Sequence, residues 1–131
     1  MTRRNARKHI FNLVFQSEFN KDLGIKDVLD TYNDEYEQLN KYETDFVSRE
    51  YRGISANLEA IDSYIEKYSR GWSVARLAKT DLAILRIGVY EIMFDDDVPA
   101  GVAVNEAVEL AKEFSDDKSY KFVNAILQNL I

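Results

Sequence analysis

Apolar residues recur along this chain at spacings of three and four, which is the period of an α-helix with one face on a core. From about residue 3 to residue 19, Ala6, Ile10 and Val14 lie on such a stripe. A second helix is expected from about residue 25 to residue 42, where a heavily charged face opposes the apolar one. That arrangement is typical of a helix on the surface of a domain.

The longest predicted helix begins after Thr44, whose hydroxyl can cap the first turn, with Asp45 close behind it. Apolar residues then continue in near-heptad register for about 25 residues, so one uninterrupted helix is expected. It should end at Gly71. Ser73 is expected to cap a short turn that runs through Leu77.

A helix that is apolar on nearly all sides follows. Thr80 is expected to cap it, and it should run from residue 81 to about residue 94. After its first residue, only Arg86 and Glu91 are charged. A helix of this kind packs against neighbours on several sides, so this segment is predicted to be the hub of the core.

Two more helices are expected, from about residue 102 to residue 114 and from residue 119 to residue 130. The chain holds only one proline and five glycines, and little of it alternates like a strand. We see no internal repeat and no linker. The pattern predicts an all-α fold of about seven helices in a single domain over residues 1–131.

The amino-acid composition excludes most kinds of catalytic and metal site. The absence of cysteine excludes thiolate metal sites and cysteine nucleophiles, and the single histidine, His9, excludes any two-histidine centre. No glycine-rich phosphate loop is present. We therefore expect neither an enzyme nor a bound cofactor or metal. No stretch is apolar enough to span a bilayer and no secretory signal is recognised, so a cytoplasmic location is expected.

The net charge of −6 conceals an asymmetry. Arg3, Arg4, Arg7 and Lys8 give the first nine residues a charge of +4 and leave the rest with −10. Cations in the first turns of a helix oppose its dipole and repel one another, so stability alone does not favour them. They predict a short anion site with His9 nearby, whereas the alternative is a frayed, solvated terminus. An acidic body would repel nucleic acid elsewhere.

A second basic segment near the end of the chain interleaves lysines with aromatic residues and an amide: Lys118, Tyr120, Lys121, Phe122 and Asn124. Aromatic rings stack single-stranded bases at about 1 to 3 kcal/mol each, while lysine neutralises phosphate. This mixture suits single-stranded RNA. The alternative is that both aromatic rings belong to the core.

Three segments carry a resemblance to a known family. They are Arg-Arg-Asn-Ala-Arg at 3–7, Asp-Leu-Ala-Ile-Leu-Arg-Ile-Gly-Val-Tyr-Glu-Ile at 81–92, and a run from Val-Pro at 98–99 through Val-Asn-Glu-Ala-Val-Glu-Leu-Ala-Lys at 104–112 to Lys-Phe-Val-Asn at 121–124. In this order and spacing they resemble the NusB family of bacterial transcription antitermination factors over essentially the whole chain. Ser115 and Ala125 stand where members commonly have Gly, and Leu82 stands where Arg or Lys is usual.

The resemblance implies two small helical bundles that share the central apolar helix. It implies a binding protein rather than a catalyst, one that recognises boxA RNA of ribosomal RNA leader transcripts as a heterodimer with the ribosomal protein NusE. In this role it would join RNA polymerase and other Nus factors and suppress Rho-dependent termination. The resemblance leaves open whether the free protein forms a homodimer.

By position, the resemblance assigns RNA binding and partner binding to separate sets of residues. The RNA set is Arg3, Arg4, Arg7, Lys118, Lys121 and Phe122, and the set facing the ribosomal protein is Phe15 and Asp81. The sequence has two alternative interpretations. One is a helical interaction or dimerisation module that docks a basic protein with no RNA role. The other is the N-terminal module of a ribosomal RNA cytosine methyltransferase, which is disfavoured because no cofactor-binding domain follows before Ile131.

Overall fold

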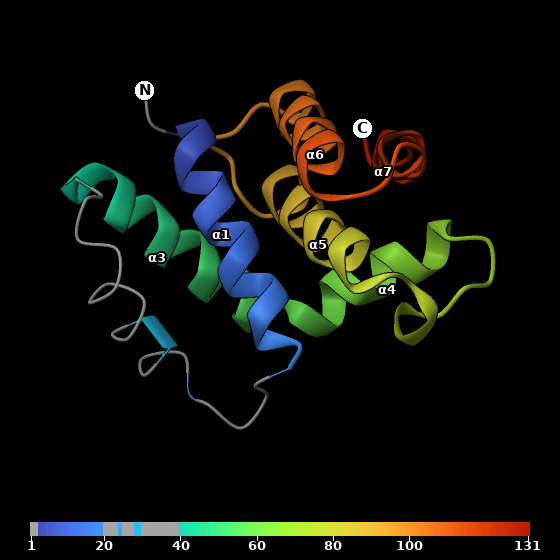
Figure 1. Cartoon of the computed structure of the whole chain (residues 1–131), viewed down its shortest axis with the longest axis horizontal. Coiled ribbons are helices and arrows are strands. Elements are labelled where there is room, and N and C mark those ends of the chain that lie inside the picture. The colour runs from blue at the N-terminus through green and yellow to red at the C-terminus, as the bar shows by residue number, and fades with distance from the viewer. Residues whose placement is uncertain (1–2, 20–23, 25–27, 30–39) are drawn as a thin grey trace.

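The computed structural model describes residues 3–19, 24, 28–29 and 40–131 (Figure 1). Over these residues it contains α-helices and one short 3-10 helix but no strand, so the all-α prediction is confirmed. The elements are α1 (Arg3–Ser17), α3 (Lys41–Ala56), α4 (Leu58–Tyr68), η1 (Val74–Arg76), α5 (Lys79–Met93), α6 (Ala100–Phe114) and α7 (Ser119–Gln128). Most of the helix predicted at 25–42 lies outside the described residues.

Helix α5 is the centre of the fold, as its apolar sequence predicts. In Figure 1 it lies between α1 and α3 on one side and α6 and α7 on the other, and it also packs against α4. Every residue from 82 to 91 is buried. Among the described residues, no helix is both long enough and apolar enough to cross a membrane.

The two charged residues on the buried part of α5 each bind another helix. The guanidinium of Arg86 lies 2.9 Å from the Asp62 carboxylate on α4 and 3.2 Å from that of Glu18, just after α1. Glu91 accepts hydrogen bonds from Arg7 on α1 at 3.0 and 3.1 Å. Because a buried charge is costly unless it is paired, these contacts explain why α5 tolerates two charges in its apolar surface.

The long helix expected after Thr44 is two helices, and the prediction of one was wrong. The break lies at Asn57, whose backbone and side-chain N–H groups both donate to the carbonyl of Gly53, at 3.1 and 2.8 Å. Asparagine commonly ends helices in this way, because its amide competes for backbone carbonyls. The apolar period continues across the break, so periodicity alone does not detect it.

Two predicted caps were also wrong. Helix α3 begins four residues before the predicted start, and its cap is Asn40, whose side-chain oxygen accepts from the backbone N–H of Glu43 at 2.8 Å. Glu43 returns the contact to the Asn40 backbone, which forms a capping box. Thr80 lies within α5, which begins at Lys79 after Ala78 and has no side-chain cap.

Candidate nucleic-acid interface

The predicted basic edge forms the first two turns of α1, and its cations differ greatly in exposure. The Arg4 side chain is 61% exposed and that of Lys8 is 39% exposed, whereas that of Arg7 is only 4% exposed. Arg3 is half-buried. The chain is helical from Arg3 onward, so the alternative of a frayed terminus does not hold there.

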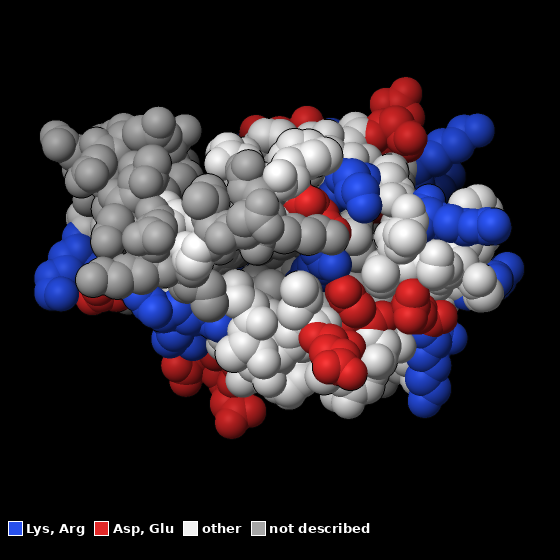
Figure 2. Space-filling model, turned by 90° about the horizontal axis from the view of Figure 1, so that it is seen from below, with Lys and Arg blue, Asp and Glu red and all other residues white. Residues whose placement is uncertain are grey.

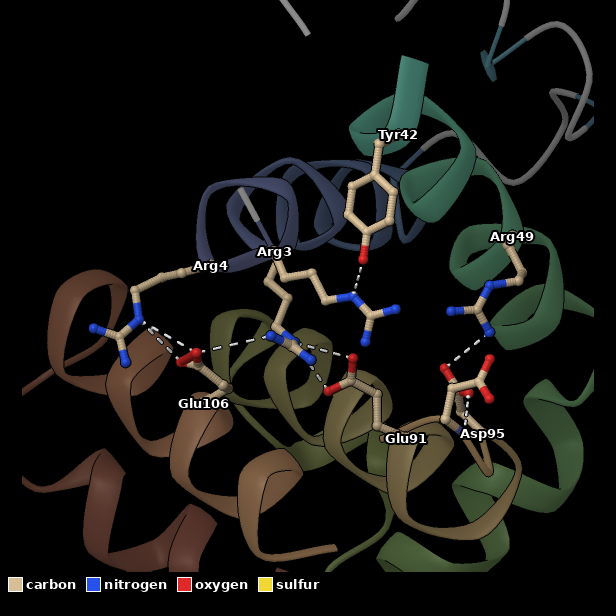
Figure 3. A network of polar contacts seen from close by, with 9 residues as sticks. Arg3, Arg4, Tyr42, Arg49, Glu91, Asp95 and Glu106 are labelled. Atoms are coloured by element: carbon tan, nitrogen blue, oxygen red, sulfur yellow. Dashed lines mark hydrogen bonds and ion pairs between the residues drawn. The ribbon is translucent and has the colours of Figure 1, made fainter. Parts of the chain in front are cut away.

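Acidic and aromatic side chains from other helices partner these cations (Figure 3). Arg4 Nε lies 3.1 Å from a Glu106 carboxylate oxygen on α6, and Lys8 Nζ lies 3.1 Å from Glu113 on the same helix. Arg3 Nε donates to the hydroxyl of Tyr42 at 2.8 Å, and its guanidinium also lies over the Phe46 ring. Tertiary packing therefore supplies the counter-charges that α1 itself lacks.

Arg7 lies beneath this surface and joins three helices. It bonds Glu91 on α5, and its Nη1 lies 3.7 Å from Glu106 on α6. Its guanidinium also lies 5.5 Å from the centre of the Phe46 ring on α3. Of the three predicted arginines, only Arg3 and Arg4 thus have side chains with substantial solvent access, while Arg7 holds the helices under them together.

A buried carboxyl group lies behind Arg7. Both side-chain oxygens of Glu50 on α3 are buried, and its carboxyl group lies beside the carboxylates of Glu91 and Asp95, which can accept a hydrogen bond from it when it is protonated. Burial, together with the nearby negative charge of Glu91, raises the pKa of Glu50 to about 11. Glu50 is therefore a neutral acid at physiological pH. Next to it, Asp95 accepts a hydrogen bond from Arg49 at 3.0 Å, which fastens the turn after α5 to α3.

Helix α7 carries the second predicted patch and has a groove on either side. Lys118 and Lys121 are exposed and Phe122 is half-buried. Phe122 lines an apolar groove of about 610 Å³ together with the exposed Trp72, while Tyr120 lines a different groove, between α6 and α7. Tyr120 and Phe122 therefore do not form one stacking surface.

Lys112 on α6 connects the two predicted patches. It lines the cleft between α1 and α6 together with Arg4 and Lys8, and it also lines the groove between α6 and α7 together with Tyr120 and Lys121. The two basic segments, more than a hundred residues apart in the sequence, thus belong to one continuous surface over α6. Figure 2 views the molecule from below, on the side away from α6 and α7 in Figure 1, and on that face acidic and basic side chains are interspersed.

The two residues predicted to face a protein partner lie along a row of aromatic rings. Phe15 stacks on Phe11 at 5.8 Å between centroids and meets the edge of Phe19 at 5.3 Å, and Phe11 stacks on Phe114 at 4.7 Å. Phe19 is 62% exposed at the end of this row. Sequence reasoning did not identify Phe19, although it continues the spacing of four from Phe11 and Phe15.

Asp81 forms hydrogen bonds with two serines of the same chain. Its carboxylate accepts hydrogen bonds from the hydroxyls of Ser115 at 2.6 Å and Ser119 at 3.2 Å. Ser115 immediately follows Phe114, one ring of the aromatic row, so Asp81 lies close to that row. The serine that departs from the family pattern therefore has a role here, because its hydroxyl joins the end of α6 to the start of α5.

Comparison with known proteins identifies the family. The model of the NusB family matches residues 4–131. The transcription antitermination protein NusB of Natranaerobius thermophilus is 45% identical, over 99% of this chain and 94% of that protein. The chain belongs to the NusB family.

Solved structures agree with this NusB-family assignment. T. maritima NusB superimposes with a TM-score of 0.91 at 37% identity, over 99% of this chain and 90% of that one. A crystal structure of the antitermination factors NusB and NusE in complex with double-stranded RNA superimposes with a TM-score of 0.87 at 26% identity, over 98% and 94% of the two chains. The resemblance noted in the sequence is confirmed.

The sequence did not reveal the acidic partners of the basic edge. Glu91 and Glu106 lie far from α1 in the chain, and only the packing of α1 against α5 and α6 brings them there. Both residues fall in the segments that carry the family resemblance, and Glu91 is also one of only two charges after the first residue of the apolar helix. The roles of the eight predicted contact residues stay predictions.

Proposed function

We propose that this NusB-family protein is a transcription antitermination factor that binds single-stranded boxA-type RNA of ribosomal RNA leader transcripts together with NusE. The observation that carries the proposal is the family match over nearly the whole chain, joined to a first helix that presents Arg4 and Lys8 to solvent. The structural neighbour that contains NusE and a double-stranded RNA supports NusE and RNA as classes of partner, and the single-stranded boxA-type sequence is part of the proposal.

RNA binding on this surface requires an exchange of counter-ions. Arg3 and Arg4 at one end, and Lys118 and Lys121 at the other, contact phosphates. For Arg4, a phosphate oxygen competes with the Glu106 carboxylate, which already binds the guanidinium at 3.1 Å. Phosphate contacts supply affinity, whereas base edges and stacking, with Phe122 as one stacking ring, supply specificity.

The protein partner binds the row of aromatic rings. Phe15 and the exposed Phe19 offer apolar area, and Asp81 lies close to the row through its hydrogen bond with Ser115, which follows Phe114. An acidic body of this kind suits a basic ribosomal protein such as NusE. The protein then acts as a tether: it holds the RNA against NusE and, with other Nus factors, keeps it attached to elongating RNA polymerase, which suppresses Rho-dependent termination. No catalytic step is involved.

The test is fluorescence anisotropy with a labelled boxA-type RNA, a scrambled RNA of the same length, and the protein with and without NusE. We expect preference for the boxA-type sequence and tighter binding when NusE is present. If about three to five phosphates are neutralised, log affinity should fall against log salt with a slope of roughly 2 to 4. A flat salt response would contradict binding by the basic edge.

One alternative has its own observation in favour. The exposed Phe19 and the net charge of −6 also fit a helical module that docks a basic protein without binding RNA. The same experiment separates the two. Under this alternative, NusE binds the protein, but neither RNA shifts the anisotropy at any salt concentration.

A further inference from the structure

A groove without acidic residues runs between α6 and α7. It has a volume of about 470 Å³, and no Asp or Glu lines it, although the protein carries 23 acidic residues against 17 lysines and arginines. Its cations are Lys112 and Lys121. The neighbouring cleft between α1 and α6 differs, because Glu106, Glu109 and Glu113 line that cleft.

The two lysines bracket an aromatic ring. The ammonium of Lys112 lies 5.2 Å from the centre of the Tyr120 ring, and that of Lys121 lies 6.0 Å from it. Tyr120 is half-buried, and the Lys112 side chain is 51% exposed. Lys112 also pairs with Glu109 at 3.7 Å, so a phosphate at this lysine replaces a carboxylate. A base stacked on the Tyr120 ring would then have one cation for the phosphate on either side of it.

Amide side chains complete the groove. Asn105 comes from α6, and Asn124 and Gln128 come from α7. All three are exposed, and the last two meet at 3.4 Å, where the Gln128 amide donates to the Asn124 oxygen. Amides carry both donors and acceptors, so they can pair with the polar edge of a base without adding charge.

We propose that the groove between α6 and α7 holds one unpaired nucleotide of the RNA strand, with its base on Tyr120 and its flanking phosphates on Lys112 and Lys121. The proposal rests on the proposed function and adds a site to it. Because Lys112 also lines the cleft that holds Arg4 and Lys8, the strand passes over α6 from the basic edge to this groove. Phe122 lies on the other side of α7 and is not part of this site.

Charge favours a nucleotide over a segment of protein in this groove. A basic partner such as a ribosomal protein would meet two lysines here and no acid, which is unfavourable, while acids are plentiful on other faces. A phosphodiester strand carries negative charge, so it meets two lysines in this groove without a repelling carboxylate. Most of the remaining surface repels it, because that surface is acidic.

The test measures affinity for a labelled boxA-type RNA in the presence of NusE, across a salt series, for matched variants. Lys112→Met removes one cation, and its control is Lys67→Met, because Lys67 lies over Tyr68 on α4 at a similar 5.3 Å but lines neither basic cleft. Asn124→Asp places a carboxylate in the groove, and its control is Ser63→Asp, which adds the same charge at an exposed position on α4. A thermal melt of each variant checks folding.

We expect Lys112→Met to weaken binding several-fold and to lower the salt slope by about 0.7, which is the loss of one phosphate contact. Asn124→Asp should weaken binding as well, and both controls should match the unsubstituted protein. Tyr120→Leu, which keeps the apolar contact but removes the stacking ring, should weaken binding about tenfold.

Three results would contradict the groove site, and each has a different meaning for the proposed function. If Lys112→Met and Asn124→Asp bind like the unsubstituted protein while Arg4→Met weakens binding, the groove is not on the path of the RNA and the proposed function stands. If Lys112→Met weakens binding of NusE in the absence of RNA, the groove is a protein site and the proposal is overturned. If the unsubstituted protein binds no RNA, the proposed function fails and the groove site fails with it.

Discussion

Arg7 shows how the surroundings of one residue decide its role. By sequence it is one of four cations in a basic terminus, but in the structure its guanidinium is buried and bound to Glu91 and Glu106. Arg4, only three residues earlier, stays exposed and shares the same Glu106 partner. Substituting all of these cations together would therefore mix an effect on binding with an effect on folding.

We expect Arg7→Met to destabilise the fold by about 3 to 5 kcal/mol, because Glu91 would be left as a buried charge without its partner. Arg4→Met should change stability by less than about 1 kcal/mol, since it removes only a largely exposed ion pair. Urea unfolding of the two variants measures both values. Equal losses in the two would show that the Arg7 pair contributes no more than a surface contact.

The raised pKa of Glu50 predicts that the stability of the fold decreases as the pH rises. Its pKa in the fold, about 11, lies above its ordinary value of 4.5, so between these values the folded state holds a proton that the unfolded state has released. This group therefore makes the free energy of unfolding decrease as the pH rises through that range. Glutamine has nearly the shape of the protonated acid and does not titrate.

We expect Glu50→Gln to be more stable than the unsubstituted protein at pH 8, by roughly 1 to 3 kcal/mol, and the difference to shrink as the pH is lowered toward about 5. Urea unfolding at both pH values measures it. A difference that does not depend on pH would show that Glu50 is ionised in the fold.

At the scale of elements, the close approach of α5 and α7 depends on a missing side chain. A Cβ added at Gly88 on α5 would lie 2.6 Å from Cδ1 of Leu127 on α7, and Leu127 is fully buried. Gly101, in the first turn of α6, has nothing within 4 Å of the same position. The two glycines look alike in the sequence and differ only in what faces them.

Gly88→Ala should destabilise the protein by about 1 to 3 kcal/mol, although alanine is the better helix former, because the added methyl overpacks the contact with Leu127. Gly101→Ala should be neutral or stabilising by up to about 1 kcal/mol, since only helix propensity changes. Thermal melts of the two variants compare these effects. A neutral Gly88→Ala would mean that the Leu127 side chain, or α7 with it, shifts at little cost.

At the scale of the whole molecule, charge is distributed so that binding is confined to a small area. The acids that neutralise the basic edge are on α5 and α6, while exposed acids such as Asp96, Asp97 and Asp117 lie in the turns before α6 and α7. A strand of RNA is therefore attracted to the exposed cations that border α6 and repelled by these turns.

Replacing Asp96, Asp97 and Asp117 with Asn should raise affinity for an unrelated single-stranded RNA a few-fold at low salt. The gain should vanish at high salt, because exposed charges are then screened. Anisotropy with a scrambled RNA at two salt concentrations measures it. Unchanged affinity would show that the acidic surface has no part in selectivity.

The amino-acid sequence by itself determined the helical class, the central place of α5 and the family. Each of these depends on information local in the chain: the period of apolar residues, the scarcity of helix breakers, and short runs of residue types in order. A run apolar on nearly all sides must be buried whatever packs on it, so the hub could be recognised without knowing its neighbours.

The tertiary structure alone decided which cations are exposed to solvent, where the helices break, and which side chains share a groove. Arg4 and Arg7 are separated by exposure, Asn57 breaks a stripe that remains periodic, and α7 directs Tyr120 and Phe122 to opposite sides. The physical reason is the same in each case. Burial and ion pairing depend on partners brought from distant parts of the chain, and no local pattern contains those partners.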